Sequence, residues 1–277
     1  MTGVAPIVAP LNYLAPGCAA VCTWACAPPQ GQPRFNGRLQ AYPMPIEDMR
    51  SLPEPAQLDT RGFALCARRS VVYDFWDEDE LRAVYYAEAE RLLCELTGAS
   101  RALVFDHTLR RRASGRPPLD GTGGSFAAVR EPVGRVHADF TPVSATSRLR
   151  RQIGDEEAGP LMDRRFAVFG LWRPTRAEPV RDAPLAVCDT RSVSSADLVC
   201  NELIYADRRG ETYIGRHNPA HRWFHVSNQT RDEVIVFKSF DSARADVTLH
   251  TAFEHPQTPP DTPLRESVEL RAFAFYS

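Results

Sequence analysis

Three metal-binding side chains occur in two places more than a hundred residues apart, so the fold must bring distant strands side by side. His137 and Asp139 are separated by one residue, and His250 follows much later. Side chains at positions i and i+2 of a strand share a face. Such a pair, with a second His, can hold one face of an octahedral Fe(II) and leave three sites open for cosubstrate, substrate and dioxygen. The sequence therefore predicts a non-haem iron site at these three residues.

An arginine and a serine follow the second histidine at a spacing that suits a carboxylate anchor. Arg265 lies fifteen residues after His250, and Ser267 lies two residues further on. If the two segments flank one hairpin, the guanidinium can reach the far carboxylate of 2-oxoglutarate while the ketoacid end chelates the metal. The guanidinium fork binds carboxylate bidentately, and a hydroxyl two residues on shares its strand face. We therefore predict that Arg265 and Ser267 bind the cosubstrate.

Other histidines compete as ligands. His217, His221 and His225 recur every four residues, which suits a zinc site on a helix, but a glycine, a proline and an aromatic pair nearby favour loop and strand. His107 follows an aspartate without the spacer residue, and His255 stands beside a proline in an expected loop. The alternative for the predicted triad is a pair of hydrogen-bonded core histidines, with the arginine paired to a surface acid. This structural alternative can explain any one of these residues, but it does not explain why all of them occur in this order and spacing.

Length and charge narrow the class of protein. The 277 residues suffice for one large β-rich domain or two small ones. The net charge of −2 and a pI near 6.4 give no reason to expect a nucleic-acid partner. Prolines interrupt the apolar N-terminus, which has no basic start, so we expect neither a signal peptide nor a membrane span. Seven cysteines without a Cys-x-x-Cys pair are interpreted as reduced thiols of a cytoplasmic protein.

The order of expected elements predicts a mainly β fold. Residues 1–34 are rich in Ala, Pro and Cys and are expected to form an extended arm, and residues 35–277 a single domain. Helical spacing predicts a helix over 77–96, and a charged helical segment is expected around 145–160. Gly and Pro make 111–128 a candidate active-site lid, with plain surface disorder as the alternative. Short strands are expected at 166–172, 184–188, 199–205, 222–226, 233–240, 246–250 and 268–276. This pattern predicts a jelly-roll, a cupin-like double-stranded β-helix with flanking helices.

Seven segments carry a resemblance to a known family, which covers the chain from about residue 35 to its end. They are VFDHT at 104–108, RVHADF at 135–140, LWRP at 171–174, APLAVCD at 183–189, FKSFDS at 237–242, HTAF at 250–253 and RESVELR at 265–271. Together they resemble the oxygenase-like family of the cephamycin methoxylation protein, the fungal gibberellin desaturase and the aspirochlorine-type hydroxylases. The resemblance implies Fe(II)/2-oxoglutarate-dependent enzymes of secondary metabolism that use dioxygen and release succinate.

The same resemblance assigns roles to residues. It implies that His137, Asp139 and His250 bind iron and that Arg265 and Ser267 bind 2-oxoglutarate. The reaction would hydroxylate, desaturate or cyclise a small natural-product intermediate. The chain departs from the family at Gly170, where Asn is frequent, and at Leu249, where Pro is frequent. These departures leave the metal set intact and leave the substrate undefined.

Four aromatic or basic residues are candidates for substrate binding. Trp172 can form an aromatic wall and Arg173 a carboxylate clamp, with a buried Trp and a structural Arg as the alternative. Tyr205 and Trp223 are further candidates for the lining of the pocket.

Two other classes of function remain open for a metal site on such a barrel. One is a metal-dependent hydrolase or lyase that uses zinc and water, which would not need Arg265. The other is a non-catalytic partner of a tailoring enzyme, for which the cephamycin system offers the example. We expect a small-molecule substrate, and a homodimer or a tailoring-enzyme partner is compatible with the sequence.

Overall fold

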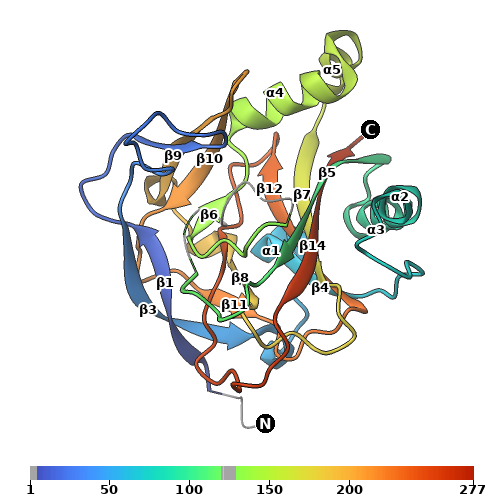
Figure 1. Cartoon of the computed structure of the whole chain (residues 1–277). Helices are drawn as coiled ribbons and strands as arrows, with labels where there is room; N and C mark the ends of the chain where they lie inside the picture. Colours follow the sequence, from blue (N-terminus) through green and yellow to red (C-terminus); the bar gives the residue numbers. More distant parts are fainter. Residues whose placement is uncertain (1–4, 120, 122–128) are drawn as a thin grey trace.

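Two β-sheets form the body of the protein (Figure 1). The structure is a computed structural model that describes residues 5–119, 121 and 129–277. One sheet has nine strands in the order β1-β3-β11-β8-β13-β6-β10-β9-β2, and the other has five in the order β4-β12-β7-β14-β5. Neighbouring strands are often far apart in sequence, as a jelly-roll requires. The predicted mainly β fold with flanking helices is confirmed.

The strands of the nine-stranded sheet are β1 (Ile7–Leu14), β2 (Val21–Trp24), β3 (Leu39–Asp48), β6 (His137–Ala138), β8 (Leu185–Cys188), β9 (Leu198–Ile204), β10 (Arg209–Gly215), β11 (Trp223–His225) and β13 (His250–Ala252). Those of the five-stranded sheet are β4 (Phe63–Ala67), β5 (Arg101–Arg111), β7 (Phe166–Pro174), β12 (Glu233–Asp241) and β14 (Glu266–Phe275). The helices are α1 (Leu58–Arg61), α2 (Glu78–Glu80), α3 (Tyr86–Thr97), α4 (Pro142–Ile153) and α5 (Asp155–Met162). A π-turn over Leu81–Tyr85 joins α2 to α3, and 3₁₀ turns cover Met49–Ser51, Thr190–Ser192 and Ser195–Asp197.

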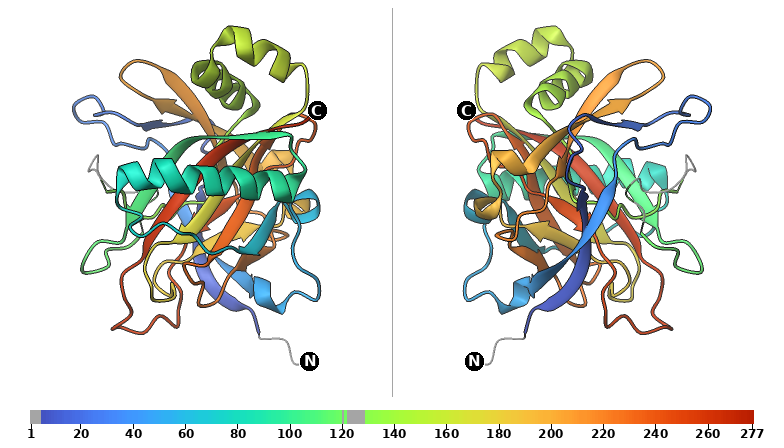
Figure 2. Two further views of the ribbon diagram at one scale, coloured as in Figure 1. Left: turned by 90° about the vertical axis from the view of Figure 1, so that its right-hand side faces the viewer. Right: turned by 90° about the vertical axis from the view of Figure 1, so that its left-hand side faces the viewer.

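The helix predicted over 77–96 covers the outer face of the five-stranded sheet (Figure 2). Asp77 caps its start by accepting hydrogen bonds from two backbone amides of the first turn. Gly98 ends it in the left-handed conformation, with φ of 67°. Leu92 and Leu93 face the sheet and are buried against it. The apolar stripe of the helix covers one face of the five-stranded sheet, so the other face points toward the nine-stranded sheet.

Strand β14 has a different chemistry on each of its two faces. Val268, Leu270 and Ala272 belong to the apolar core under α3. Ser267, Glu269 and Arg271 alternate with them, so they lie on the opposite face, toward the nine-stranded sheet. Glu269 is 5% exposed and Ser267 is 1% exposed. Buried polar groups are costly unless they are paired, so this face needs specific partners.

A glycine on β7 makes room for an aromatic ring of β12, the neighbouring strand in the same sheet. A Cβ at Gly170 would overlap the ring of Phe237 on β12. The Phe237 ring packs in turn on the imidazole of His250, with ring centroids 4.5 Å apart. Gly170, where the resembled family frequently has Asn, therefore makes room for the aromatic ring that supports a candidate metal ligand.

The segment expected to be an N-terminal arm instead supplies both edge strands of the nine-stranded sheet. Strand β1 pairs antiparallel with β3, and β2 pairs parallel with β9. Leu11 and Tyr13 of β1 alternate into the core. This strand was not predicted because prolines interrupt its alternating pattern. Proline is tolerated at an edge, where half of the backbone amides need no partner in the sheet.

Part of the predicted lid cannot be compared with the structure. Residues 120 and 122–128 of that segment lie outside the described residues, so the lid stays a prediction. Among the described residues, none of the helices combines the length and the apolar character needed to span a membrane.

Candidate metal centre and cosubstrate pocket

The three predicted metal ligands lie together between the two sheets. Strands β6 and β13 are neighbours, and His137 is paired directly with His250 across them. Asp139 follows β6, and its Oδ1 lies 3.7 Å from Nε2 of His137 and 3.9 Å from Nε2 of His250. All three candidate ligand atoms lie within 4.8 Å of one another. Within the described part of the chain, no other group of three His, Cys, Asp or Glu residues has this geometry.

Backbone carbonyls orient both imidazoles for coordination through Nε2. Nδ1 of His137 lies 2.8 Å from the carbonyl oxygen of Arg135, and Nδ1 of His250 lies 3.3 Å from that of Thr248. Each Nδ1 therefore carries the proton and donates it, which leaves the lone pair of Nε2 facing Asp139. Nε2 of His250 is buried and has no hydrogen-bond partner. A metal ion would supply the missing partner.

Arg271 binds one oxygen of Asp139 and leaves the other free to face the imidazoles. Its Nε donates to Oδ2 at 2.6 Å, so Oδ1 is the oxygen that faces the imidazoles. Burial alone would raise the pKa of Asp139, but the Arg271 cation and the two imidazoles outweigh it and hold the pKa well below its ordinary value. Arg271 also pairs with Glu269 at 2.8 Å. The carboxylate is thus ionised, and its Oδ1 would be the oxygen available to a metal ion.

The donor set fits Fe(II). Two neutral imidazoles and one carboxylate on one face are the ligands of non-haem iron sites with open positions. Burial, followed by the proximity of His250, lowers the pKa of His137 well below its usual range, so its nitrogen is available to a metal at neutral pH. The unpartnered Nε2 of His250 and the oriented Oδ1 of Asp139 are the atoms that a metal ion would bind.

The predicted cosubstrate residues lie at the start of β14 and are buried. Arg265 is 3% exposed; its Nε donates to Ser267 Oγ at 3.1 Å and its Nη1 to the carbonyl of Ala183 at 2.6 Å. The guanidinium carbon stands 4.9 Å from the ring centroid of Trp172. Burial, followed by the nearby Arg110, lowers the pKa of Arg265 to about 9. The structure thus places Arg265, Ser267 and Trp172 together.

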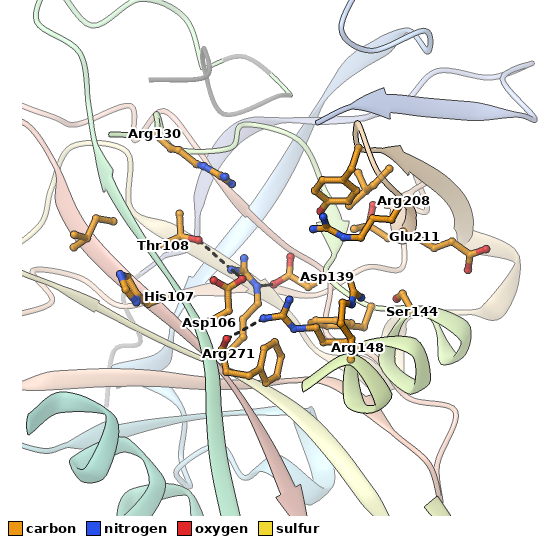
Figure 3. A pocket seen from close by; sticks show the side chains of 18 of the residues that line it. Asp106, His107, Thr108, Arg130, Asp139, Ser144, Arg148, Arg208, Glu211 and Arg271 are labelled. Atoms are coloured by element: carbon orange, nitrogen blue, oxygen red, sulfur yellow. Dashed lines mark hydrogen bonds and ion pairs between the residues drawn. The ribbon is translucent and has the colours of Figure 1, made fainter. Parts of the chain in front are cut away.

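A pocket of about 430 Å³ opens beside Asp139 and Arg271. Figure 3 shows the side chains of Arg130, Arg148 and Arg208 directed toward this space. They come from three places: a bridge to β5, helix α4 and the turn between β9 and β10. Tyr205, one of the predicted substrate residues, also lines the pocket, and its ring lies 3.7 Å from the guanidinium carbon of Arg208.

The other predicted substrate residues do not line this pocket. Arg173 faces the helix side of β7, where it donates to two backbone carbonyls and lies over the ring of Tyr85. Trp223 is fully buried, and its indole nitrogen donates to Tyr13 Oη at 2.8 Å. Trp172 faces inward but reaches the Arg265 end of the site.

The competing histidines have other partners. His221 lies between Tyr13 and Asp197, at 3.1 Å and 3.2 Å from their oxygens, and the ring of His217 stacks on that of Tyr42. His107 bridges the side chains of Tyr86 and Glu78 at the rim of the pocket. The lone lysine of the chain, Lys238, is fully buried and pairs with Asp241 and Asp246.

The arginine beside Asp139 and the other arginines of the pocket were not predicted from the sequence. Arg271 stands four residues after Ser267 on the same strand face, and this alternation could have identified it. Arg130, Arg148 and Arg208 carry no local signal, because the three segments meet only in the folded chain.

Comparisons with known proteins agree with this geometry. A family model described as "Oxidoreductase/YMDC permease-like domain" matches residues 11–275. The hydroxylase/desaturase efuI of Hormonema carpetanum is 32% identical over 257 residues, covering 86% of this chain and 85% of the relative. The Fe(II)/2-oxoglutarate-dependent dioxygenase nvfI of Aspergillus novofumigatus is 31% identical, covering 90% and 88%.

A solved structure matches as well. The iron and alpha-ketoglutarate-dependent endoperoxidase NvfI superposes with a TM-score of 0.86 at 25% identity, over 99% of each chain. The chain belongs to this oxygenase family. Membership confirms the resemblance carried by the seven segments, and the superposition confirms the predicted double-stranded β-helix core of this oxygenase.

Proposed function

We propose that this oxygenase binds Fe(II) through His137, Asp139 and His250 and oxidises a small natural-product intermediate with dioxygen and 2-oxoglutarate. The observation that carries the proposal is the buried, unpartnered Nε2 of His250 facing the oriented Oδ1 of Asp139. Bound iron, with 2-oxoglutarate and dioxygen, supplies the oxidising power to remove hydrogen from an unactivated carbon, while 2-oxoglutarate becomes carbon dioxide and succinate. The outcome is hydroxylation, desaturation or cyclisation.

The side chains of the chain hold and orient these groups. Asp139 contributes the negative charge that retains the metal, and Arg271 keeps the carboxylate in one rotamer. Arg265 and Ser267 bind the far carboxylate of 2-oxoglutarate, with the guanidinium fork and hydroxyl on one strand face. Trp172 forms the wall behind Arg265, and with Phe237 it excludes water from the metal side.

The pocket beside Asp139 is the proposed substrate site. Because the candidate ligand Asp139 lines this pocket, a molecule bound there would lie beside the proposed metal centre. Tyr205 offers an aromatic surface, and Arg148 and Arg208 offer guanidinium donors that suit the acceptor oxygens of an oxygenated substrate. A homodimer or tailoring-enzyme partner and a cytoplasmic location stay proposals, the latter supported by seven unpaired cysteines.

Oxygen-dependent turnover of the cosubstrate tests the proposed function. Protein incubated with Fe(II), ascorbate and 2-oxoglutarate is expected to form succinate slowly even without its substrate. The formation should need dioxygen and should stop in His250→Ala. Succinate at the level of a protein-free control, from a folded and iron-loaded sample, would contradict the proposal and favour a metal-dependent hydrolase or a non-catalytic protein.

A further inference from the structure

A second buried arginine lies directly across from the predicted cosubstrate anchor. Arg110 on β5 is paired in register with Ser267 on β14. Its neighbour two residues back, Thr108, accepts a hydrogen bond from Arg271 at 3.1 Å, so this face of β5 looks into the site. Arg110 is 7% exposed, and its Nη1 donates to the backbone carbonyl of Glu131 at 2.8 Å. Arg110 and Arg265 therefore approach the site from adjacent strands.

Neither of these two cations has a carboxylate partner. Arg271 forms ion pairs with Asp139 and Glu269, and Arg112 forms one with Glu254 at 2.6 Å. Among the described residues, no carboxylate oxygen lies within 4.0 Å of the guanidinium of Arg110 or Arg265. Burial, followed by opposing effects of Glu269 and Arg271, lowers the pKa of Arg110 to about 10. Two like charges are thus buried near each other, and neither guanidinium forms an ion pair with a described carboxylate.

Such an arrangement is costly in the ligand-free protein. A buried charge without an ion-pair partner destabilises the folded protein, and a second charge of the same sign adds repulsion. Arg110 uses one of its nitrogens on a neutral carbonyl, and Arg265 uses two on a hydroxyl and a carbonyl. The remaining donors suit an anion with two separated negative charges. A dicarboxylate of five carbons has this charge and can span two anchors.

We propose that Arg110 is a second cosubstrate-binding residue, which holds the keto-end carboxylate of 2-oxoglutarate while Arg265 and Ser267 hold the far one. The inference rests on the proposed function. Arg110 receives the keto end because its face of β5 continues to Thr108, which contacts Arg271, the partner of the candidate metal ligand Asp139. Arg265 instead contacts Ser267 and the carbonyl of Ala183. Two fixed anchors then set the direction in which the cosubstrate lies against the metal.

Arg110→Met tests this role, with Arg111→Met as the matched control. Arg111 is the next residue of the same strand, but its half-exposed side chain faces the other way, against Trp76 and Glu266. The readout is binding, by anaerobic titration of the Fe(II)-loaded protein with 2-oxoglutarate, followed through the visible charge-transfer band. Arg110→Met is expected to raise the apparent Kd at least about tenfold, as loss of a charge-assisted hydrogen bond does, and Arg111→Met by less than about twofold.

The melting temperature separates a ligand-binding role from a structural one. Replacement of an uncompensated buried cation by an apolar side chain is expected to leave the melting temperature of the ligand-free protein unchanged or higher. A lower melting temperature with an unchanged Kd would assign Arg110 to the fold and overturn the proposal. Should Arg110→Met fold poorly, Arg110→Lys keeps the charge without the fork and is expected to weaken binding less than Met does.

A monocarboxylate probe tests which end Arg110 holds. 2-Oxobutyrate has the keto-end carboxylate and lacks the far one. Arg110→Met should weaken both 2-oxoglutarate and 2-oxobutyrate, whereas Arg265→Met should weaken 2-oxoglutarate alone. Weakening of 2-oxoglutarate alone by Arg110→Met would overturn the keto-end assignment. If the parent protein binds iron but gives no band with 2-oxoglutarate, the proposed function itself is overturned. If instead Arg110→Met has the same Kd as the parent, only the role of Arg110 is overturned.

Discussion

Arg271 and Asp139 join the two sheets at the candidate metal centre, with Nε of the arginine 2.6 Å from Oδ2 of the aspartate. The arginine belongs to β14 of the five-stranded sheet, and the aspartate follows β6 of the nine-stranded sheet. The ligand is therefore oriented by the sheet that also carries Arg265 and Ser267. This contact would couple the proposed metal site to the proposed cosubstrate site.

Loss of Arg271 should weaken the metal site. Arg271→Met leaves Asp139 as a buried carboxylate without its partner, which is expected to destabilise the metal-free protein by about 3–5 kcal/mol. Residues that orient metal ligands typically contribute about 10–100-fold to metal affinity. Fe(II) affinity, measured against a competing chelator, should fall by that factor. Arg176→Met, at a partly exposed ion pair, is the control; equal iron affinity in both variants would contradict the role of Arg271.

Arg265 and Ser267 should differ in how much they contribute to cosubstrate use. Arg265→Met removes the charged fork and is expected to raise the KM for 2-oxoglutarate about a hundredfold, whereas Ser267→Ala removes a neutral hydroxyl and should raise it less than about tenfold. Succinate formation at varied 2-oxoglutarate concentration measures both. An unchanged KM in Arg265→Met would show that the far carboxylate lies elsewhere.

A methyl group at Gly170 should disturb the metal site through Phe237. The added Cβ overlaps the Phe237 ring, which packs on His250. Gly170→Ala is expected to lower the free energy of unfolding by about 1–3 kcal/mol, as overpacking does. Gly159→Ala is the matched control, because no atom lies within 4 Å of its Cβ in helix α5, where alanine is favoured. Denaturant titration decides; similar effects of the two substitutions would refute the steric argument.

Stability should fall in mild acid because of His225. Burial lowers its pKa from 6.5 to about 4, and its Nδ1 is buried without a partner. Between these values the unfolded chain binds a proton that the native protein does not, so stability is lost as the pH falls from 6.5 to 4. The loss from this residue amounts to about 3 kcal/mol. In His225→Gln the free energy of unfolding should depend less steeply on pH over this range; an identical slope would contradict the prediction.

Two parts of the candidate site could be predicted from the sequence because the spacing of their residues is local. The spacing of His137 and Asp139, and that of Arg265 and Ser267, reflects strand alternation, whereas His250 was assigned from its place in the ordered set. The structure pairs His137 with His250 and brings Arg265 to Ser267. The capped helix beyond Asp77 followed from propensity and periodicity for the same reason.

Other features depend on contacts that the sequence does not encode locally. All nine residues of β7 are buried, so periodicity could not tell that Trp172 faces the site and Arg173 the helix. Strand β6 has only two residues, too few to show a strand pattern. Its partner β13 lies more than a hundred residues later in the chain, so their pairing is visible only in the fold. Arg148 and Arg208 line the same pocket but belong to segments far apart in the sequence, so no local spacing indicates that they act together.

Anaerobic titration of the metal-free protein with Fe(II) and 2-oxoglutarate tests the central claim most directly. The parent should develop the visible charge-transfer band of an iron–ketoacid chelate at one equivalent of iron. His250→Ala should lose the band, and His255→Ala, outside the triad, should keep it. Stoichiometric iron binding in the parent without a band at saturating 2-oxoglutarate, or a band that survives in His250→Ala, would contradict the account.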